Sequence, residues 1–330
     1  MSQYVLGVDG GGTKTNAVIL DEHARLCGFG RCGSSNLDDL GLDVIQANIS
    51  NAIHQACQMA GLASASFASA FFGMAGVVST RDRYAIQKIA EDMHLAPVEQ
   101  IGIDHDCRIA LAGGLRGRPG IVVIAGTGSS CFGMNAERES WRAGGWGHLL
   151  ADEGSGYWLG LHAMQIAVAS FDGRAKPYVL MELVKRHLGL TDINEIMHRL
   201  YVVGMSRAEM AALAPFVLDA AAAGDEASIN LVQRGTQELA DCILAVAQHL
   251  SLASGYPEIV LVGGLFQSGE IFLQPMHQAI LQRLPGCRIQ QPEFPPVLGA
   301  CILGLQALSL PMGDEQAHSL HKQVEKLGIG

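Results

Sequence analysis

The feature that most constrains this sequence is a pattern that occurs twice: an apolar segment, a glycine-rich turn, and a second apolar segment. The first copy consists of YVLGV at 4–8, the turn DGGGTKT at 9–15 and NAVIL at 16–20. The second consists of GIVVIA at 120–125, a GTGSS turn and CFGM at 131–134. Short apolar runs bounded by glycine turns are typical of buried strands. Each glycine turn therefore joins two strands, not a strand to a helix.

Each turn is followed by a comparable series of elements. After the first turn we expect strands at 25–31, 67–74 and 100–104, and helices at 42–60, 79–94 and about 107–114. After the second turn we expect strands near 139–143, at 258–262 and at 287–290, a largely helical stretch at about 155–253, and helices at 270–283 and 298–309. The recurring order predicts an α/β protein with two duplicated domains, the second carrying a helical insertion.

The predicted domains are 1–116 and 117–310, with the insertion at about 155–253. A chain of 330 residues has a comfortable length for two such domains. The polar tail 311–330 is either a loose end or a helix that returns to the first domain. The segment GGLRGRPG at 113–120 is rich in glycine and polar residues, so it is our candidate for the hinge.

Composition excludes several classes of function. The formal net charge is −10 and no run of Lys or Arg stands out, which argues against nucleic-acid binding. No apolar run is long enough to span a bilayer, and the first residues lack the features of a secretory signal. The eight cysteines are scattered with no CxxC pair, as expected for reduced thiols. The sequence therefore predicts a cytoplasmic protein without nucleic-acid or membrane partners.

Both turns have the chemistry of a phosphate site. Glycines let a phosphate approach the backbone N–H groups, and Thr13 and Thr15 add hydroxyl groups. A P-loop is excluded because Thr13 directly precedes Lys14, and a dinucleotide fingerprint is excluded because its last glycine is missing. A third glycine signal, LVGGLF at 261–266, follows a strand, and its small residues would let an adenine ring lie against the backbone.

Taken in order, these three segments resemble the superfamily that contains actin, heat-shock chaperones and hexokinase. Within it, the chain is similar to the N-acetylglucosamine kinases of the BadF/BadG/BcrA/BcrD ATPase family, which also includes activators of benzoyl-CoA reductase. The resemblance covers about residues 4–308 and implies two ribonuclease H-like domains around a central cleft. Its most specific segments are GVDGGGTKT, the SSN of 34–36, IDHDCRIALAGG at 103–114, IAGTGSSC at 124–131 and GGWGHLLADEGSGYWLG at 144–160.

The resemblance also implies roles for individual positions, with ATP and Mg²⁺ as cofactors and no iron–sulfur cluster. Asp9 would hold Mg²⁺ through water, and Asp106 would be the catalytic base that also contacts the sugar. The ATP-binding positions would be Gly11, Gly12, Thr13, Lys14, Thr127, Gly128, Gly263 and Gly264. The other sugar-binding positions would be Asn36, Ser129, Ser130, Gly145, Trp146, Gly147 and Asp152.

Two of these assignments have competitors within the sequence. Asp104 competes with Asp106 as the base, and Asp106 also suits a helix N-cap, which does not conflict with catalysis. The segment 144–153 is interpreted as a sugar-binding loop. Its alternative is a glycine-rich loop around a core tryptophan with a solvated acidic pair.

The expected activity is phosphorylation of N-acetylglucosamine to its 6-phosphate. Glucosamine stays open as the substrate, because Asp38 and Asp39 follow Asn36 and could meet an ammonium group. Two alternatives belong to other classes: an ATPase activator of a CoA-ester reductase, and a nucleotide-gated interaction protein. The activator would need cluster-binding cysteines, and no cysteine follows Cys131 before Cys242. A homodimer is expected only from the resemblance to this family.

Overall fold

The computed structural model describes residues 3–37, 40–63, 66–176, 179–253 and 255–329. The chain divides into two compact units. The first comprises Met1–Arg118 together with Gln291–Gly330, and the second comprises Pro119–Gln290. Among the described residues, no helix is both long and apolar enough to cross a bilayer.

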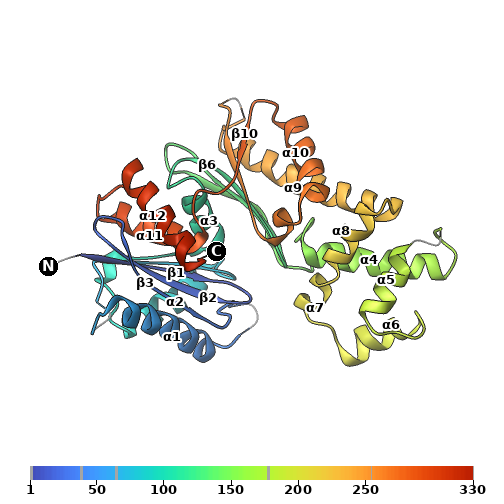
Figure 1. Ribbon diagram of the computed structural model, residues 1–330, viewed down its shortest axis with the longest axis horizontal. Helices are drawn as coiled ribbons and strands as arrows, with labels where there is room; N and C mark the ends of the chain where they lie inside the picture. The colour runs from blue at the N-terminus through green and yellow to red at the C-terminus, as the bar shows by residue number, and fades with distance from the viewer. Residues whose placement is uncertain (1–2, 38–39, 64–65, 177–178, 254, 330) are drawn as a thin grey trace. The chain divides into compact units, whose positions relative to one another are not determined.

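The first unit is built on a five-stranded sheet with the order β3-β2-β1-β4-β5 (Figure 1). Its strands are β1 (Tyr4–Gly10), β2 (Thr15–Asp21), β3 (Leu26–Cys32), β4 (Ser69–Met74) and β5 (Ile101–His105). The first three strands pair antiparallel, and β4 and β5 continue the sheet in parallel with β1. The first glycine turn is thus the hairpin between β1 and β2, as the sequence predicts.

Helices cover both faces of this sheet because its strands are apolar on both sides. One face packs against α1 (Leu42–Ala60) and α2 (Thr80–Asp92), with Leu6 and Val8 of β1 in the shared core. The other face packs against α11 (Pro296–Ala307) and α12 (Asp314–Leu327), with Val5 and Val18 between them. A short helix η1 (Val98–Gln100) precedes β5, and α3 (Asp106–Gly114) follows it.

The second unit repeats this topology. Its sheet has the order β10-β9-β6-β7-β8, which is the first order read in reverse with each strand replaced by its counterpart. The strands are β6 (Gly120–Ala125), β7 (Ser129–Met134), β8 (Ser140–Gly144), β9 (Glu258–Val262) and β10 (Arg288–Gln290). The antiparallel hairpin again comes first, and β9 then pairs in parallel with β6. The predicted duplication of an α/β fold is therefore confirmed.

Most of the second unit's helices lie between β8 and β9, where the insertion was predicted. They are α4 (Gly156–Phe171), α5 (Val179–His187), α6 (Glu195–His198), the π-helix η2 (Arg199–Val203), α7 (Arg207–Ala211), α8 (Ala214–Ala222) and α9 (Glu226–His249). A 3-10 helix η3 (Gly264–Gln267) and α10 (Glu270–Arg283) follow β9. One apolar core joins the sheet to these helices, including Trp158 of α4 and Ile243 of α9.

The placement of α11 differs from the sequence prediction, which assigned residues 291–310 to the second domain. In the structure α11 packs on β1 and α3 of the first unit. Glycines make this possible: a Cβ at Gly299 would collide with the backbone of Ile109 and Gly113 in α3. A Cβ at Gly7 of β1 would lie 2.6 Å from the Sγ of Cys301. The tail also contributes to this unit, since the side chain of Gln323 in α12 accepts a hydrogen bond from the N–H of Leu26.

The candidate hinge segment 113–120 is only partly a linker. Gly113 and Gly114 end α3, and their carbonyl oxygens accept hydrogen bonds from the N–H groups of Phe294 and Glu293. The Glu293 side chain also pairs with Arg118 at 2.8 Å. The chain therefore leaves and re-enters the first unit at one firmly bonded place, and the boundary between units falls after Arg118.

Candidate functional site

The first glycine turn rests on a buried polar segment. Within the turn, the N–H of Gly11 donates to the carbonyl oxygen of Lys14 at 2.9 Å. Beneath it, the Thr15 hydroxyl lies 2.8 Å from the Ser35 hydroxyl, and the N–H of Ser35 donates to the Gly11 carbonyl at 3.2 Å. Asn36 follows in the chain and is only 6% exposed. The structure thus joins the turn to the SSN segment of 34–36, while Gly12 and Thr13 stay exposed at its tip.

Asp9 and Asp106 form a coupled carboxylate pair beside this turn. Asp9 occupies the end of β1, and Asp106 begins α3 directly after β5. Burial, followed by the negative charge of Asp106, raises the pKa of Asp9 to about 6; the Asn16 amide and Lys14 act in the opposite direction. A divalent cation would stabilise the buried Asp9 carboxylate, whose ionisation the Asp106 charge disfavours, and Mg²⁺ prefers such oxygen ligands. The residues present therefore fit the expected Mg²⁺.

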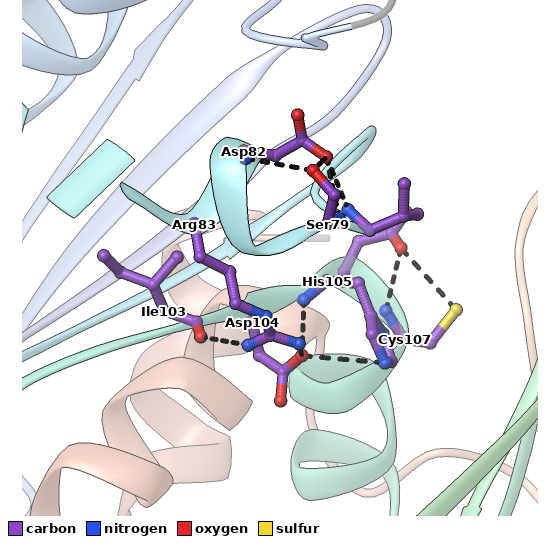
Figure 2. A network of polar contacts seen from close by, with 9 residues as sticks. Ser79, Asp82, Arg83, Ile103, Asp104, His105 and Cys107 are labelled. Carbon is purple, nitrogen blue, oxygen red and sulfur yellow. Dashed lines mark hydrogen bonds and ion pairs between the residues drawn. The ribbon is translucent and has the colours of Figure 1, made fainter. Parts of the chain in front are cut away.

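Asp104 is committed to structural contacts, as Figure 2 shows. Its Oδ1 accepts from Nη2 of Arg83 at 2.7 Å and from the N–H of His105 at 2.8 Å. Arg83 is anchored further by a bond from Nη1 to the carbonyl oxygen of Ile103. The Asp106 carboxylate instead accepts locally, from the N–H of Cys107 at 2.9 Å. The two candidate bases therefore have different surroundings.

In the second unit, the Asp152 side chain contacts the end of the other glycine turn. Its Oδ1 accepts from the N–H of Ser129 at 3.3 Å, and its Oδ2 pairs with Nη2 of Arg207 at 3.0 Å. The side chain is buried, with the residue 3% exposed, and its backbone has a φ of 64°, a left-handed conformation that Asp tolerates better than most residues. Burial raises the pKa of Asp152, while the Ser129 amide and Arg207 oppose this shift.

The turn itself is fixed to the start of α4. The N–H of Gly156 donates to the Gly126 carbonyl at 2.8 Å, and the N–H of Tyr157 donates to the Thr127 carbonyl at 3.1 Å. Thr127 stays exposed at the tip. The Ser129 hydroxyl donates to the carbonyl oxygen of Glu153 at 2.7 Å, which holds the strand start to the Asp152 loop.

The loop at 144–147 lies against the same strand. Gly145 has a φ of 66°, and a Cβ there would lie 2.6 Å from the Ser130 hydroxyl. This hydroxyl is buried and has no hydrogen-bond partner among the described residues. Trp146 is 66% exposed and is approached by Arg142 at 5.0 Å from its ring. The alternative of a core tryptophan is therefore wrong, and Trp146 offers an open apolar surface near Gly147.

The late glycine pair meets the second turn. Gly263 directly follows β9 and has a φ of 119°, and a Cβ there would collide with the backbone of Ala125 at the end of β6. Only glycine suits this combination of backbone angle and close approach. Gly264 has open space where a Cβ would be. The carboxyl ends of the neighbouring parallel strands β6 and β9 thus carry four of the predicted residues: Thr127, Gly128, Gly263 and Gly264.

The described residues bring the candidates together in two groups, one in each unit. Asp9, the first turn, Asn36 and Asp106 belong to the first, and the second turn, the 144–152 loop and the late glycine pair belong to the second. Asp38 and Asp39, which kept glucosamine open, lie outside the described residues.

Two arginines were missed by the sequence analysis, although they define the site's ion pairs. Arg83 pairs with Asp104, and Arg207 pairs with Asp152 from 55 residues further along the chain. Each lies on a helix surface with no motif around it. An unpaired acidic residue predicted to be buried was the available signal, because such a carboxylate requires a cationic partner.

The raised pKa of Asp9 predicts a pH-dependent cost to stability. The folded-state pKa of about 6 exceeds the ordinary value of 3.8, so the folded state holds the proton more tightly. The contribution of Asp9 to stability therefore falls as pH rises between these values, by about 3 kcal/mol. With EDTA present, we expect Asp9→Asn to be more stable than the wild type at pH 7.5 and to lose this advantage below about pH 4.

Thermal unfolding between pH 4 and pH 8 measures this difference. The exposed Asp43→Asn removes the same charge elsewhere on the first unit and serves as the control. A stability difference for Asp9→Asn that does not change with pH would contradict the expectation.

The fold and the two glycine turns define the class of protein. Duplicated α/β units with this strand order are those of the actin-like ATPase fold of sugar kinases. The chain belongs to the BadF/BadG/BcrA/BcrD ATPase family, whose model matches residues 6–304.

Individual relatives are similar over almost their whole length. An N-acetylmuramic acid/N-acetylglucosamine kinase of Clostridium acetobutylicum is 32% identical, over 91% of this chain and 98% of the relative. An N-acetyl-D-glucosamine kinase of Dictyostelium discoideum is 28% identical, over 92% and 98%. A candidate N-acetylglucosamine kinase from Chromobacterium violaceum, a solved structure, superposes with a TM-score of 0.74 at 26% identity, covering 92% of this chain and 99% of that chain.

Proposed function

We propose that this protein is an ATP-dependent amino-sugar kinase that transfers the γ-phosphoryl group to the 6-hydroxyl of N-acetylglucosamine. The observation that carries the proposal is the carboxylate pair Asp9 and Asp106 beside a glycine turn. One carboxylate can serve the metal while the other serves the hydroxyl, which are the two tasks that phosphoryl transfer gives to acidic groups. Family membership and the named kinase relatives support the same activity.

Asp106 is the proposed general base. A carboxylate within reach of the sugar hydroxyl can accept its proton as the hydroxyl attacks phosphorus. Asp104 is a weaker candidate, because Arg83 and the N–H of His105 already occupy its Oδ1. Because these protein donors engage Oδ1, it is less available to a sugar hydroxyl than the carboxylate of Asp106.

Asp9 is proposed to hold Mg²⁺ through water. When bound, the ion would neutralise charge on the phosphates. The chain's own contribution is a buried carboxylate whose ionisation is disfavoured until a cation arrives. Gly11 and Gly12 would then border the phosphates at the first turn, with Thr13 and Lys14 beside them.

The second unit is proposed to bind parts of both substrates. Thr127 and Gly128 would contact phosphate, while Gly263 and Gly264 would border the adenine. Sugar contacts of this unit would come from the two serines after the turn and from the neighbouring loop. Asn36 is the proposed sugar-binding position of the first unit. These positions are Asn36, Ser129, Ser130, Gly145, Trp146, Gly147 and Asp152. The unpartnered Ser130 hydroxyl and the exposed Trp146 ring support this, since a sugar offers both hydroxyls and an apolar face.

A neutral acetamido sugar is favoured over glucosamine. Near the proposed loop, Arg207 already balances the charge of the buried Asp152 carboxylate, so this carboxylate can accept from sugar hydroxyls but adds no unbalanced negative charge for an ammonium group. A third relative is a glucosamine kinase of Vibrio cholerae at 27% identity, so glucosamine is tested as a substrate as well.

The substrate prediction is tested by ATP consumption over a panel of sugars. Values of kcat/KM are compared for N-acetylglucosamine, N-acetylmuramic acid, glucosamine and glucose. NMR of the product identifies the oxygen that carries the phosphate. We expect the highest kcat/KM for N-acetylglucosamine and phosphate on its 6-oxygen. ATP hydrolysis that no sugar accelerates would instead indicate the nucleotide-gated interaction protein.

A further inference from the structure

Arg207 reaches the second glycine turn from the helical insertion. It begins α7, which is fixed at its start by Ser206: the Ser206 hydroxyl accepts from the N–H of Glu209 at 3.2 Å. Glu209 in turn pairs with Arg199 at 2.7 Å. Contacts of Glu209 with Ser206 and Arg199 thus anchor the short helix. Its first residue, Arg207, directs its guanidinium toward Asp152 and the turn.

The guanidinium lies directly against Gly128. A Cβ at Gly128 would lie 3.1 Å from Nη2 of Arg207 and 3.0 Å from Oδ2 of Asp152. A group bound at the backbone of Gly128 would therefore lie close to the arginine. A Cβ at this position would therefore press against the ends of both side chains.

Part of the guanidinium's hydrogen-bonding capacity is unused. Nη2 donates to Asp152, but Nε is buried and has no hydrogen-bond partner among the described residues. A buried donor without a partner is unfavourable, and more so in a charged group. An anion at the turn would be a partner for the guanidinium, which lies beside Gly128 through Nη2 and whose planar fork matches the oxygens of a phosphate.

We propose that Arg207 is a ligand for the polyphosphate of the bound nucleotide, held at the second glycine turn by Asp152. The inference rests on the proposed function only in placing a nucleotide at Thr127 and Gly128. Asp152 then has two tasks: its Oδ2 orients the arginine, and its remaining lone pairs face the sugar. The helical insertion thereby supplies a positive charge that the turn itself lacks.

Nucleotide binding without sugar tests this directly. Affinities for ADP, AMP-PNP and AMP with Mg²⁺ are measured by calorimetry for the wild type, Arg207→Met and Arg207→Lys. We expect Arg207→Met to weaken AMP-PNP and ADP about 10–100-fold and AMP much less, because charged hydrogen bonds to phosphate are lost. Arg207→Lys keeps the charge and should recover part of the affinity.

Arg199→Met is the matched control, because it removes another arginine–carboxylate pair that ends on α7 without touching the turn. Unchanged nucleotide affinity in Arg199→Met supports the proposal, whereas an equal loss there would show that the position of α7 is responsible and would overturn it. Unchanged nucleotide affinity in Arg207→Met with a raised sugar KM would also overturn it, leaving Arg207 as a support for Asp152 alone. A wild type that binds nucleotide but phosphorylates no sugar would reject the proposed function and still allow this test.

Discussion

Asp106→Asn is expected to reduce kcat by about 10²–10⁴-fold, the usual contribution of a general base. The amide is isosteric and can still accept from the N–H of Cys107, so the start of α3 should be preserved. Nucleotide affinity should not fall, because removing the Asp106 charge also relieves Asp9. Steady-state kinetics with N-acetylglucosamine and nucleotide calorimetry measure the two effects separately.

Asp104→Asn is the matched control for this experiment. It weakens the pair with Arg83, whose side chain is 41% exposed, so the expected cost is a modest loss of stability of about 1 kcal/mol or less. Its kcat should stay within several-fold of the wild type. If Asp104→Asn lost turnover while Asp106→Asn kept it, the two assignments would have to be exchanged.

Gly299→Ala is expected to lower the free energy of unfolding by about 3 kcal/mol, at the upper end of the range for overpacked cores. The added Cβ would collide with the backbone of Ile109 and Gly113, and backbone atoms cannot rotate away as a side chain can. The helices α3 and α11 would have to separate, moving Asp106 at the start of α3. We therefore expect kcat to fall as well, and amide hydrogen exchange in α3 to become faster.

Gly304→Ala makes the same change on the same helix. Its Cβ would lie 3.5 Å from the Ser69 hydroxyl and from the Cβ of Val5, which is ordinary contact. Replacing a helical glycine by alanine stabilises a helix by up to about 1 kcal/mol, so this variant should be at least as stable as the wild type. Equal unfolding free energies for the two variants would show that the close crossing of α3 and α11 is not essential.

Much of the fold could be predicted because its signals are local. The apolar runs at 4–8 and 120–125, each ending in a glycine turn, mark strands that are buried on both faces and need no distant information. The helical period of 42–60 matches α1 for the same reason. The duplication could be predicted because the same order of strands and helices follows each glycine turn.

The contacts that could not be predicted all join distant parts of the chain. Nothing in the sequence around residue 299 indicates that a glycine there lets α11 cross α3, so residues 291–310 were assigned to the wrong unit. The pairing of Arg207 with Asp152 depends on how the insertion folds back, which periodicity does not specify. Site roles, by contrast, came from the resemblance, and they stay predictions.

The return of α11 and α12 to the first unit has a consequence for biosynthesis. Pro119–Gln290 is continuous, so this unit can be completed while the chain is still emerging from the ribosome. The N-terminal sheet must wait for α11 and α12, and until then the face with Val5, Val18 and Leu20 lacks its cover. Translation that stops short of residue 296 would therefore leave an N-terminal half with an exposed apolar face, which would be prone to aggregation and would be a substrate for chaperones or proteases.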